Sequence, residues 1–265
     1  SYRNVGIGDA NARLSVGPDG IVSLLITYAD TGTGAHTILW QMIAEVLDIP
    51  FSQVKLEVGT TDCFRSEAGT GASRVTFVLG QAVLNAVDKL KALLRDRAGK
   101  MLGVSADEIA IEKGRLVSKR HSSRSLSLAQ VAAAASVKGK PLEVESYHEE
   151  TETPAEGVFT ACVAEVYVDT ETGQVHLRKL DTVHDVAMIL NPVGHQGQID
   201  GGIMQGVGYA LTEEMVMEDG QVTTLNLGEY KIPNVKDIST LKTTLVRGDV
   251  GAGPFQSKEI SESGI

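Results

Sequence analysis

The stretch Asp30-Thr31-Gly32-Thr33-Gly34-Ala35-His36-Thr37 constrains the fold more than any other part of the sequence. It follows a predicted hairpin over residues 12–30 and precedes apolar residues at helical spacing that end at Pro50. Two glycines therefore join a strand to a helix. The unpaired N–H groups at the start of such a helix bind phosphate well. Such residues more often form a tight turn without a ligand, so this stretch alone does not show whether a ligand binds.

A second stretch of the same kind, Glu67-Ala68-Gly69-Thr70-Gly71-Ala72-Ser73-Arg74, stands before a long predicted helix over residues 76–97. Two such loops so close in sequence favour an extended anionic ligand that backbone donors hold at several points. Arg74 would add a charge-assisted contact to that ligand. The alternative for its side chain is a surface ion pair.

A third segment combines a turn over residues 184–192 with a predicted glycine-rich helix over residues 196–216. Five glycines lie between positions 197 and 208. Each costs a helix roughly 0.8–1 kcal/mol relative to alanine, so a close approach to the helix should compensate. Gln198 and Gln205 lie on one helical face and would contact a polar cofactor ring. Close packing of another helix over the glycines is the alternative explanation.

Composition restricts the classes of function. The chain has 265 residues, and its net charge of 24 − 34 = −10 does not suit the phosphate backbone of nucleic acid. Cys63 and Cys162 form no CxxC pair, which argues against iron–sulfur, zinc and disulfide sites. No apolar run approaches the roughly 18 residues of a membrane span, and no signal peptide is visible. These features predict a reduced, cytoplasmic protein without nucleic-acid or membrane partners.

The order of predicted elements indicates an α+β fold in two lobes of mixed and antiparallel sheets with packed helices. The first lobe, residues 1–145, contains both glycine loops, a hairpin over residues 109–117 and an alanine-rich helix near residues 128–135. A polar stretch over residues 143–157 is expected to cross to the second lobe, residues 146–265. Both ends of the sequence look like cuts, so the chain is expected to be a fragment.

In their order and spacing these motifs resemble the C-terminal part of the molybdopterin-binding large subunit of the xanthine dehydrogenase/aldehyde oxidase family. The resemblance covers nearly the whole chain. It rests on residues 30–37, residues 68–74, Gly80-Gln81-Ala82-Val83, residues 185–192, Gly197-Gln198-Ile199-Asp200-Gly201, Gln205-Gly206 and Tyr230-Lys231-Ile232-Pro233.

The resemblance implies a molybdopterin whose dithiolene holds the molybdenum, so the protein need not supply a metal ligand. In bacterial relatives the pterin usually carries a cytosine dinucleotide, whose pyrophosphate would suit the two glycine loops. By match, the cofactor would be lined by Gly32, Thr33, Gly34, Ala35, His36, Gly71, Ala72, Ser73, Arg74 and Gln198.

The family's general base is a glutamate in a Lys-Gly-x-Gly-Glu pattern, and this sequence has Lys258-Glu259-Ile260-Ser261-Glu262 at the matching place. The resemblance therefore implies that Glu262 is the catalytic base in the hydroxylation of an aldehyde or an N-heterocycle with water-derived oxygen. Both glycines of the pattern are replaced, so Glu259 is an alternative base. In the first loop, Thr33 stands where family members commonly have glutamine.

The resemblance also implies partners. The N-terminal half of the large subunit would complete the site for a small-molecule substrate, and 2Fe-2S and FAD subunits or domains would accept the electrons. The fragment without them is expected to be inactive. The alternative is a cofactor-free assembly or binding module on the same scaffold, which the altered glutamate pattern would favour. A serine hydrolase is excluded because no Gly-x-Ser-x-Gly motif is present.

Overall fold

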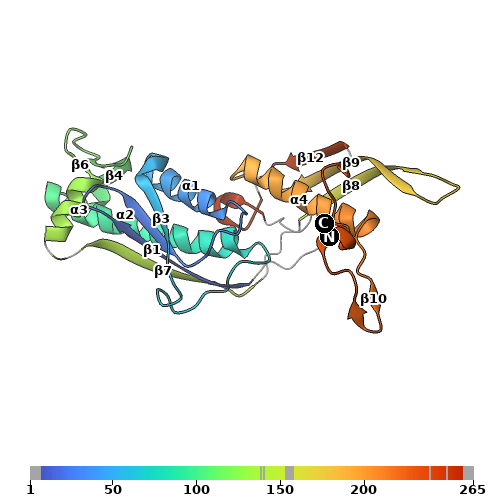
Figure 1. Ribbon diagram of the computed structural model, residues 1–265. Helices are drawn as coiled ribbons and strands as arrows, with labels where there is room; N and C mark the ends of the chain where they lie inside the picture. Colours follow the sequence, from blue (N-terminus) through green and yellow to red (C-terminus); the bar gives the residue numbers. More distant parts are fainter. Residues whose placement is uncertain are drawn as a thin grey trace. The chain divides into compact units, whose positions relative to one another are not determined.

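The computed structural model describes residues 7–137, 139, 141–152, 158–238, 240–248 and 250–258. These residues form two compact units, one from Ile7 to Glu152 and one from Val158 to Lys258 (Figure 1). Both units combine helices with mixed or antiparallel sheets, which confirms the predicted α+β class.

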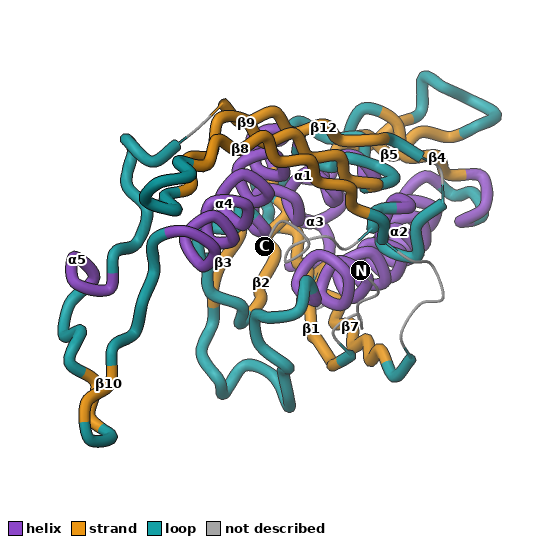
Figure 2. The backbone as a smooth tube through the Cα atoms, turned by 90° about the vertical axis from the view of Figure 1, so that its right-hand side faces the viewer, coloured by secondary structure: helices purple, strands orange, loops and turns teal. Residues whose placement is uncertain are grey.

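The first unit is built on a sheet with the strand order β3-β2-β1-β7 (Figure 2). Strand β1 (Gly8–Val16) pairs antiparallel with β2 (Val22–Ile26) and with β7 (Leu142–Glu150), and β3 (Val54–Val58) runs parallel to β2. Buried and partly exposed residues alternate along β2 because one face of the sheet carries the helices. The predicted first hairpin is confirmed.

Two helices cover this sheet and bury its apolar face. Helix α1 (Ala35–Leu47) follows the first glycine loop, and helix α2 (Gly80–Leu102) follows the second after a π-helical turn over Val75–Leu79. Helix α2 packs along β7 and β1, with Leu90 and Leu94 fully buried. Burial of each such side chain stabilises the unit by roughly 1.5–3 kcal/mol.

A small sheet completes the first unit. It contains β4 (Ile109–Glu112), β5 (Arg115–Ser118) and β6 (Ser125–Ser127), followed by helix α3 (Leu128–Val137). The turn between β4 and β5 is formed by Lys113 and Gly114, both with positive φ. A two-residue turn of this type matches the twist of the strands it joins, as the predicted hairpin requires. Single 3-10 turns lie at Phe51–Gln53 and Ala106–Glu108.

The polar stretch that the sequence predicts as a crossover between the lobes is strand β7 for most of its length. Leu142 and Ser146 are buried, whereas Glu143 and Glu145 are exposed. This edge strand has one face on α2 and the other in solvent, so its sequence is mostly polar. The boundary predicted between residues 145 and 146 therefore falls inside a strand, and the first unit extends to at least Glu152.

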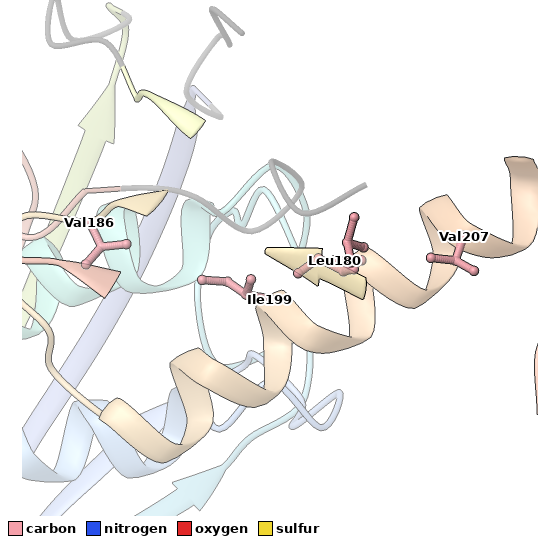
Figure 3. Packing of buried hydrophobic residues seen from close by; sticks show 5 residues of the cluster. Leu180, Val186, Ile199 and Val207 are labelled. Carbon is pink, nitrogen blue, oxygen red and sulfur yellow. The ribbon is translucent and has the colours of Figure 1, made fainter. Parts of the chain in front are cut away.

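The second unit contains a sheet with the order β12-β9-β8. Strand β8 (Thr160–Val168) pairs antiparallel with β9 (Val175–Asp185), and β12 (Thr240–Val246) runs parallel to β9. Helix α4 (Pro192–Leu211) packs on this sheet. The core between them consists of Leu180, Val186, Ile199, Ile203 and Val207 (Figure 3).

Helix α4 begins four residues before the predicted start and ends at Leu211 instead of Val216. Asn191 caps the helix by accepting the N–H of Gly194, and Pro192 occupies the first turn, where no N–H is needed. Beyond α4 the chain forms the short hairpin β10 (Met217–Glu218) and β11 (Gln221–Val222), the one-turn helix α5 (Leu227–Tyr230) and a 3-10 turn at Pro254–Gln256.

Candidate functional site

The first glycine loop leads into α1 with its backbone in the left-handed region. Gly32 has φ +89° and Gly34 has φ +77°, and Gly34 is the N-cap of α1. The carboxylate of Asp30 accepts the N–H of Gly32 at 2.9 Å. No side chain among the described residues caps the helix, and a Cβ at either glycine would meet nothing within 4 Å. The start of α1 therefore offers backbone donors beside open space.

The second glycine loop is more strained than the first. Gly69 has φ +72°, and the two consecutive residues Ala72 and Ser73 also lie in the left-handed region. For residues with a side chain this conformation costs roughly 1–2 kcal/mol each. Arg74 holds the loop closed, because its guanidinium donates to the carbonyls of Ala68 (3.0 Å) and Gly71 (3.1 Å). The sequence predicts a ligand contact or a surface ion pair for Arg74 and does not reveal this intraloop contact.

Strand β1 anchors the second loop. The carbonyl of Asp9 accepts the N–H of Ala68 at 3.1 Å, and the amide of Asn11 donates to the carbonyl of Ser66 at 2.5 Å. A Cβ at Gly8 would lie 2.5 Å from the Cβ of Ala68, so the two backbones meet closely. Burial, with Asp9 nearby, raises the pKa of Glu67 above its ordinary value.

Tyr28, which lies two residues beyond β2, connects the two loops. Its carbonyl contacts Nε2 of His36 at 2.9 Å. Its hydroxyl donates to the carbonyl of Asp9 at 3.2 Å, and the same carbonyl accepts the N–H of Ala68 in the second loop. Burial and the nearby carboxylates of Glu67 and Asp9 raise the pKa of Tyr28 to about 12. The structure therefore brings the predicted loop residues 32–36 and 71–74 into one region of the first unit.

Gln198 lies on α4 in the second unit, exposed on the same face as Gln205. Gly197 and Gly201 also face open space, whereas a Cβ at Gly208 would lie 2.9 Å from Cδ of Pro233. The sequence leaves two explanations for the glycines of this helix. Close packing accounts for Gly208, and the open positions near Gln198 leave room for a ligand.

This difference within α4 predicts opposite effects of two alanine substitutions. Gly201→Ala is expected to raise the free energy of unfolding by about 0.8–1 kcal/mol, because alanine is the better helix former. Gly208→Ala is expected to lower it by about 1–3 kcal/mol, because the added Cβ clashes with Pro233. Urea unfolding of the two variants measures both changes. Shifts of the same sign would contradict this account of the helix.

The turn over residues 184–192 contacts residues 257 and 258, where the segment with the glutamate pattern begins. Lys258 and Asp185 form an ion pair at 2.5 Å, in which the Lys258 side chain is only 11% exposed. Ser257 forms a β-bridge with Ala187, so this segment is also held through its backbone. Sequence analysis predicts a functional role for both segments but does not predict the ion pair between Asp185 and Lys258. Glu262 and its alternative Glu259 lie outside the described residues.

A polar network lies beneath α4. His184 is fully buried, with Nδ1 3.3 Å from the hydroxyl of Thr160, and Asp200 accepts the hydroxyl of Thr243 at 2.6 Å. Burial lowers the pKa of His184 and of His195, which favours neutral imidazoles. Across the described ranges, no three or more His, Cys, Asp or Glu side chains are grouped so that they could hold a metal ion.

Comparison with known proteins identifies the family. Residues 2–239 match the family model described as "Molybdopterin cofactor-binding domain". The chain belongs to the molybdopterin-binding large subunits of the xanthine dehydrogenase/aldehyde oxidase family. This finding confirms the resemblance seen in the sequence.

Three bacterial proteins illustrate the similarity. The xanthine dehydrogenase molybdenum-binding subunit of Escherichia coli O157:H7 is 31% identical over 98% of this chain and 35% of its own length. The aldehyde oxidoreductase molybdenum-binding subunit of the same strain is 26% identical over 100% of this chain and 35% of its own length. Quinoline 2-oxidoreductase from Pseudomonas putida 86 has a similar structure, with TM-score 0.85 and 26% identity over 97% of this chain and 33% of that chain.

The chain spans about a third of the length of these two curated relatives. Its loop geometry fits a molybdopterin, because the open positions at Gly32, Gly34, Gly69 and Gly71 let a ligand approach the backbone. A search of the described helices finds none with the length and apolar character of a membrane span.

Proposed function

We propose that the two glycine loops and Gln198 bind the cytosine dinucleotide form of molybdopterin. The observation that carries the proposal is that both loops are anchored beside Tyr28 and that their glycines face open space. Tyr28 contacts His36 after the first loop and the carbonyl of Asp9, which also accepts the N–H of Ala68 in the second loop. The N–H groups of residues 33–36 and 71–73 would surround the phosphates, and Gly32, whose N–H the Asp30 carboxylate accepts, would shape the turn beside them. The guanidinium of Arg74 would supply positive charge. The exposed amide of Gln198 would contact a polar ring of the cofactor.

We further propose that the chain is part of a hydroxylase that acts on an aldehyde or an N-heterocycle. The bound cofactor would supply two-electron redox chemistry. In the overall reaction a carbon–hydrogen bond is replaced by a carbon–oxygen bond, water supplies the oxygen, and two protons and two electrons are released. Glu262 would accept a proton from the water-derived nucleophile. The names of the relatives, which include xanthine dehydrogenase and aldehyde oxidoreductase subunits, support this class of reaction.

Such a reaction needs partners that accept the electrons. We propose 2Fe-2S and FAD subunits or domains for this role, and the remainder of the large subunit for closing the substrate site. The relatives are described as subunits, and they are about three times as long as this chain. The chain by itself would then be inactive. We place the complex in the cytoplasm, in keeping with the free thiols of Cys63 and Cys162.

Molybdenum and nucleotide analysis of the full-length subunit, produced with its partner subunits, tests the proposal. The expected result is stoichiometric molybdenum, cytidine monophosphate released by acid hydrolysis, and hydroxylation of at least one aldehyde or N-heterocycle. A correctly assembled complex without molybdenum would overturn the proposal and favour a cofactor-free assembly module. Stoichiometric molybdenum without cytidine monophosphate would overturn the dinucleotide assignment alone.

A further inference from the structure

We propose that the hairpin of β8 and β9 is a docking surface for the part of the large subunit that lies outside this chain. The inference rests on the proposed function, in which the chain is one part of a longer subunit, and it names the surface that the remainder covers. The evidence is an apolar hairpin that the second unit leaves largely uncovered.

Strand β8 has the composition of a buried strand but is exposed. Its sequence is Thr-Ala-Cys-Val-Ala-Glu-Val-Tyr-Val, in which Glu165 is the only charged residue. Apolar residues at successive positions are typical of strands that are covered on both faces. Eight of the nine residues are nevertheless exposed, with Val163 at 66% and Tyr167 at 57%. The strand therefore presents an apolar surface that the second unit does not bury.

Helix α4 and strand β12 support only one end of this hairpin. Strand β12 pairs with β9 over residues 179–185, and the core beneath α4 takes Leu180 from β9. Residues 166–168 and 175–177 pair with each other beyond that end of the sheet (Figure 1). A ribbon of two strands is marginally stable in water by itself. The outer half of the hairpin therefore needs a further layer.

The uncovered surface includes both faces and the outer edge of β8. Residues paired across two strands lie on the same face, so Val166 lies with Leu177, and Tyr167 lies with His176 on the opposite face. The strand order β12-β9-β8 leaves the outer edge of β8 without a neighbouring strand in the described part of the chain. An exposed apolar edge promotes aggregation, so the assembled protein is expected to cover it.

The remainder of the same subunit is the occupant that fits this surface. The two curated relatives are matched over 35% of their length, so about two thirds of each lies outside the matched part. Permanent interfaces are more apolar than those of partners that associate and dissociate. The apolar composition of β8 therefore favours a permanent contact within the large subunit over the proposed 2Fe-2S and FAD partners.

Photo-cross-linking of the full-length large subunit tests the inference. Tyr167 is replaced by p-benzoyl-phenylalanine, which on irradiation forms a covalent bond to a neighbouring C–H group, and mass spectrometry identifies the attached peptide. We expect that peptide to come from outside these 265 residues and the product to keep the mass of one subunit.

Two matched substitutions show whether the apolar surface makes this contact. Val163→Asp is expected to lower the cross-linking yield about tenfold, because a carboxylate at an apolar interface loses its hydration. Val137→Asp makes the same change at an isolated residue of α3 that is 89% exposed, and the yield should not change. Equal yields in the two variants would show that β8 does not form the interface.

The peptide attached at position 167 decides between the possible occupants. Attachment to residues 7–152, to a second copy, or to a 2Fe-2S or FAD partner would overturn the inference. No attachment at all would also overturn it, because the hairpin would then face solvent. Cross-linking requires neither molybdenum nor activity. A subunit that gives the expected cross-link and holds no molybdenum would therefore contradict the proposed function alone.

Discussion

Glu262→Gln is expected to lower kcat of the full-length enzyme by about 10²–10⁴-fold, the usual contribution of a general base. Glutamine has nearly the same size and keeps a hydrogen-bonding oxygen, but it cannot accept the proton. Molybdenum content should stay the same, because the proposed cofactor contacts lie elsewhere in the sequence. Steady-state kinetics with an aldehyde and an N-heterocycle, together with metal analysis, measure both quantities.

Glu259→Gln is the matched control for this prediction. It removes the neighbouring carboxylate of the same segment, which is the alternative base that the altered glycine pattern leaves open. Its kcat should stay within about threefold of the parent value if Glu262 is the base. The assignment is wrong if Glu259→Gln loses activity and Glu262→Gln retains it.

Lys258→Met is expected to lower the free energy of unfolding of the second unit by about 2–3 kcal/mol. Removal of one partner from a buried ion pair leaves the other charge uncompensated, which costs about 3–5 kcal/mol when both groups are buried. The Asp185 side chain is 29% exposed and keeps some hydration, so the expected loss is smaller. Urea unfolding, followed by a probe in the second unit, measures the change.

Lys55→Met provides the comparison in the first unit. Lys55 and Glu57 form an ion pair at 2.7 Å, but their side chains are 63% and 49% exposed. Solvent screens such a pair, so the substitution should cost less than about 1 kcal/mol. Equal losses in the two variants would show that the Asp185–Lys258 pair does not hold its segment in place.

Local patterns are sufficient to predict most of the elements. Alternation and a turn sequence predict β1 and β2, and helical spacing of apolar residues predicts α1 and α2. The glycine loops are found in the same way, because left-handed backbone at Gly32, Gly34 and Gly69 favours glycine. In each case the residues that decide the structure are close together in the sequence.

Contacts between distant residues cannot be predicted in this way. By sequence Tyr28 is an ordinary apolar position at the end of a strand, and its contacts with His36 and with the carbonyl of Asp9 appear only in the structure. Strand β7 is mostly polar because half of it faces solvent, and only its pairing with β1 shows that it belongs to the first unit. The pairing of Asp185 with Lys258 likewise joins positions 73 residues apart.

Hydrogen exchange of the full-length subunit with and without its cofactor tests the central claim most directly. If both glycine loops hold the molybdopterin, amides of residues 31–37 and 67–74 should exchange more slowly in the loaded protein, and peptides from the β4–β5 hairpin should not change. Loaded protein in which neither loop is protected would contradict the account.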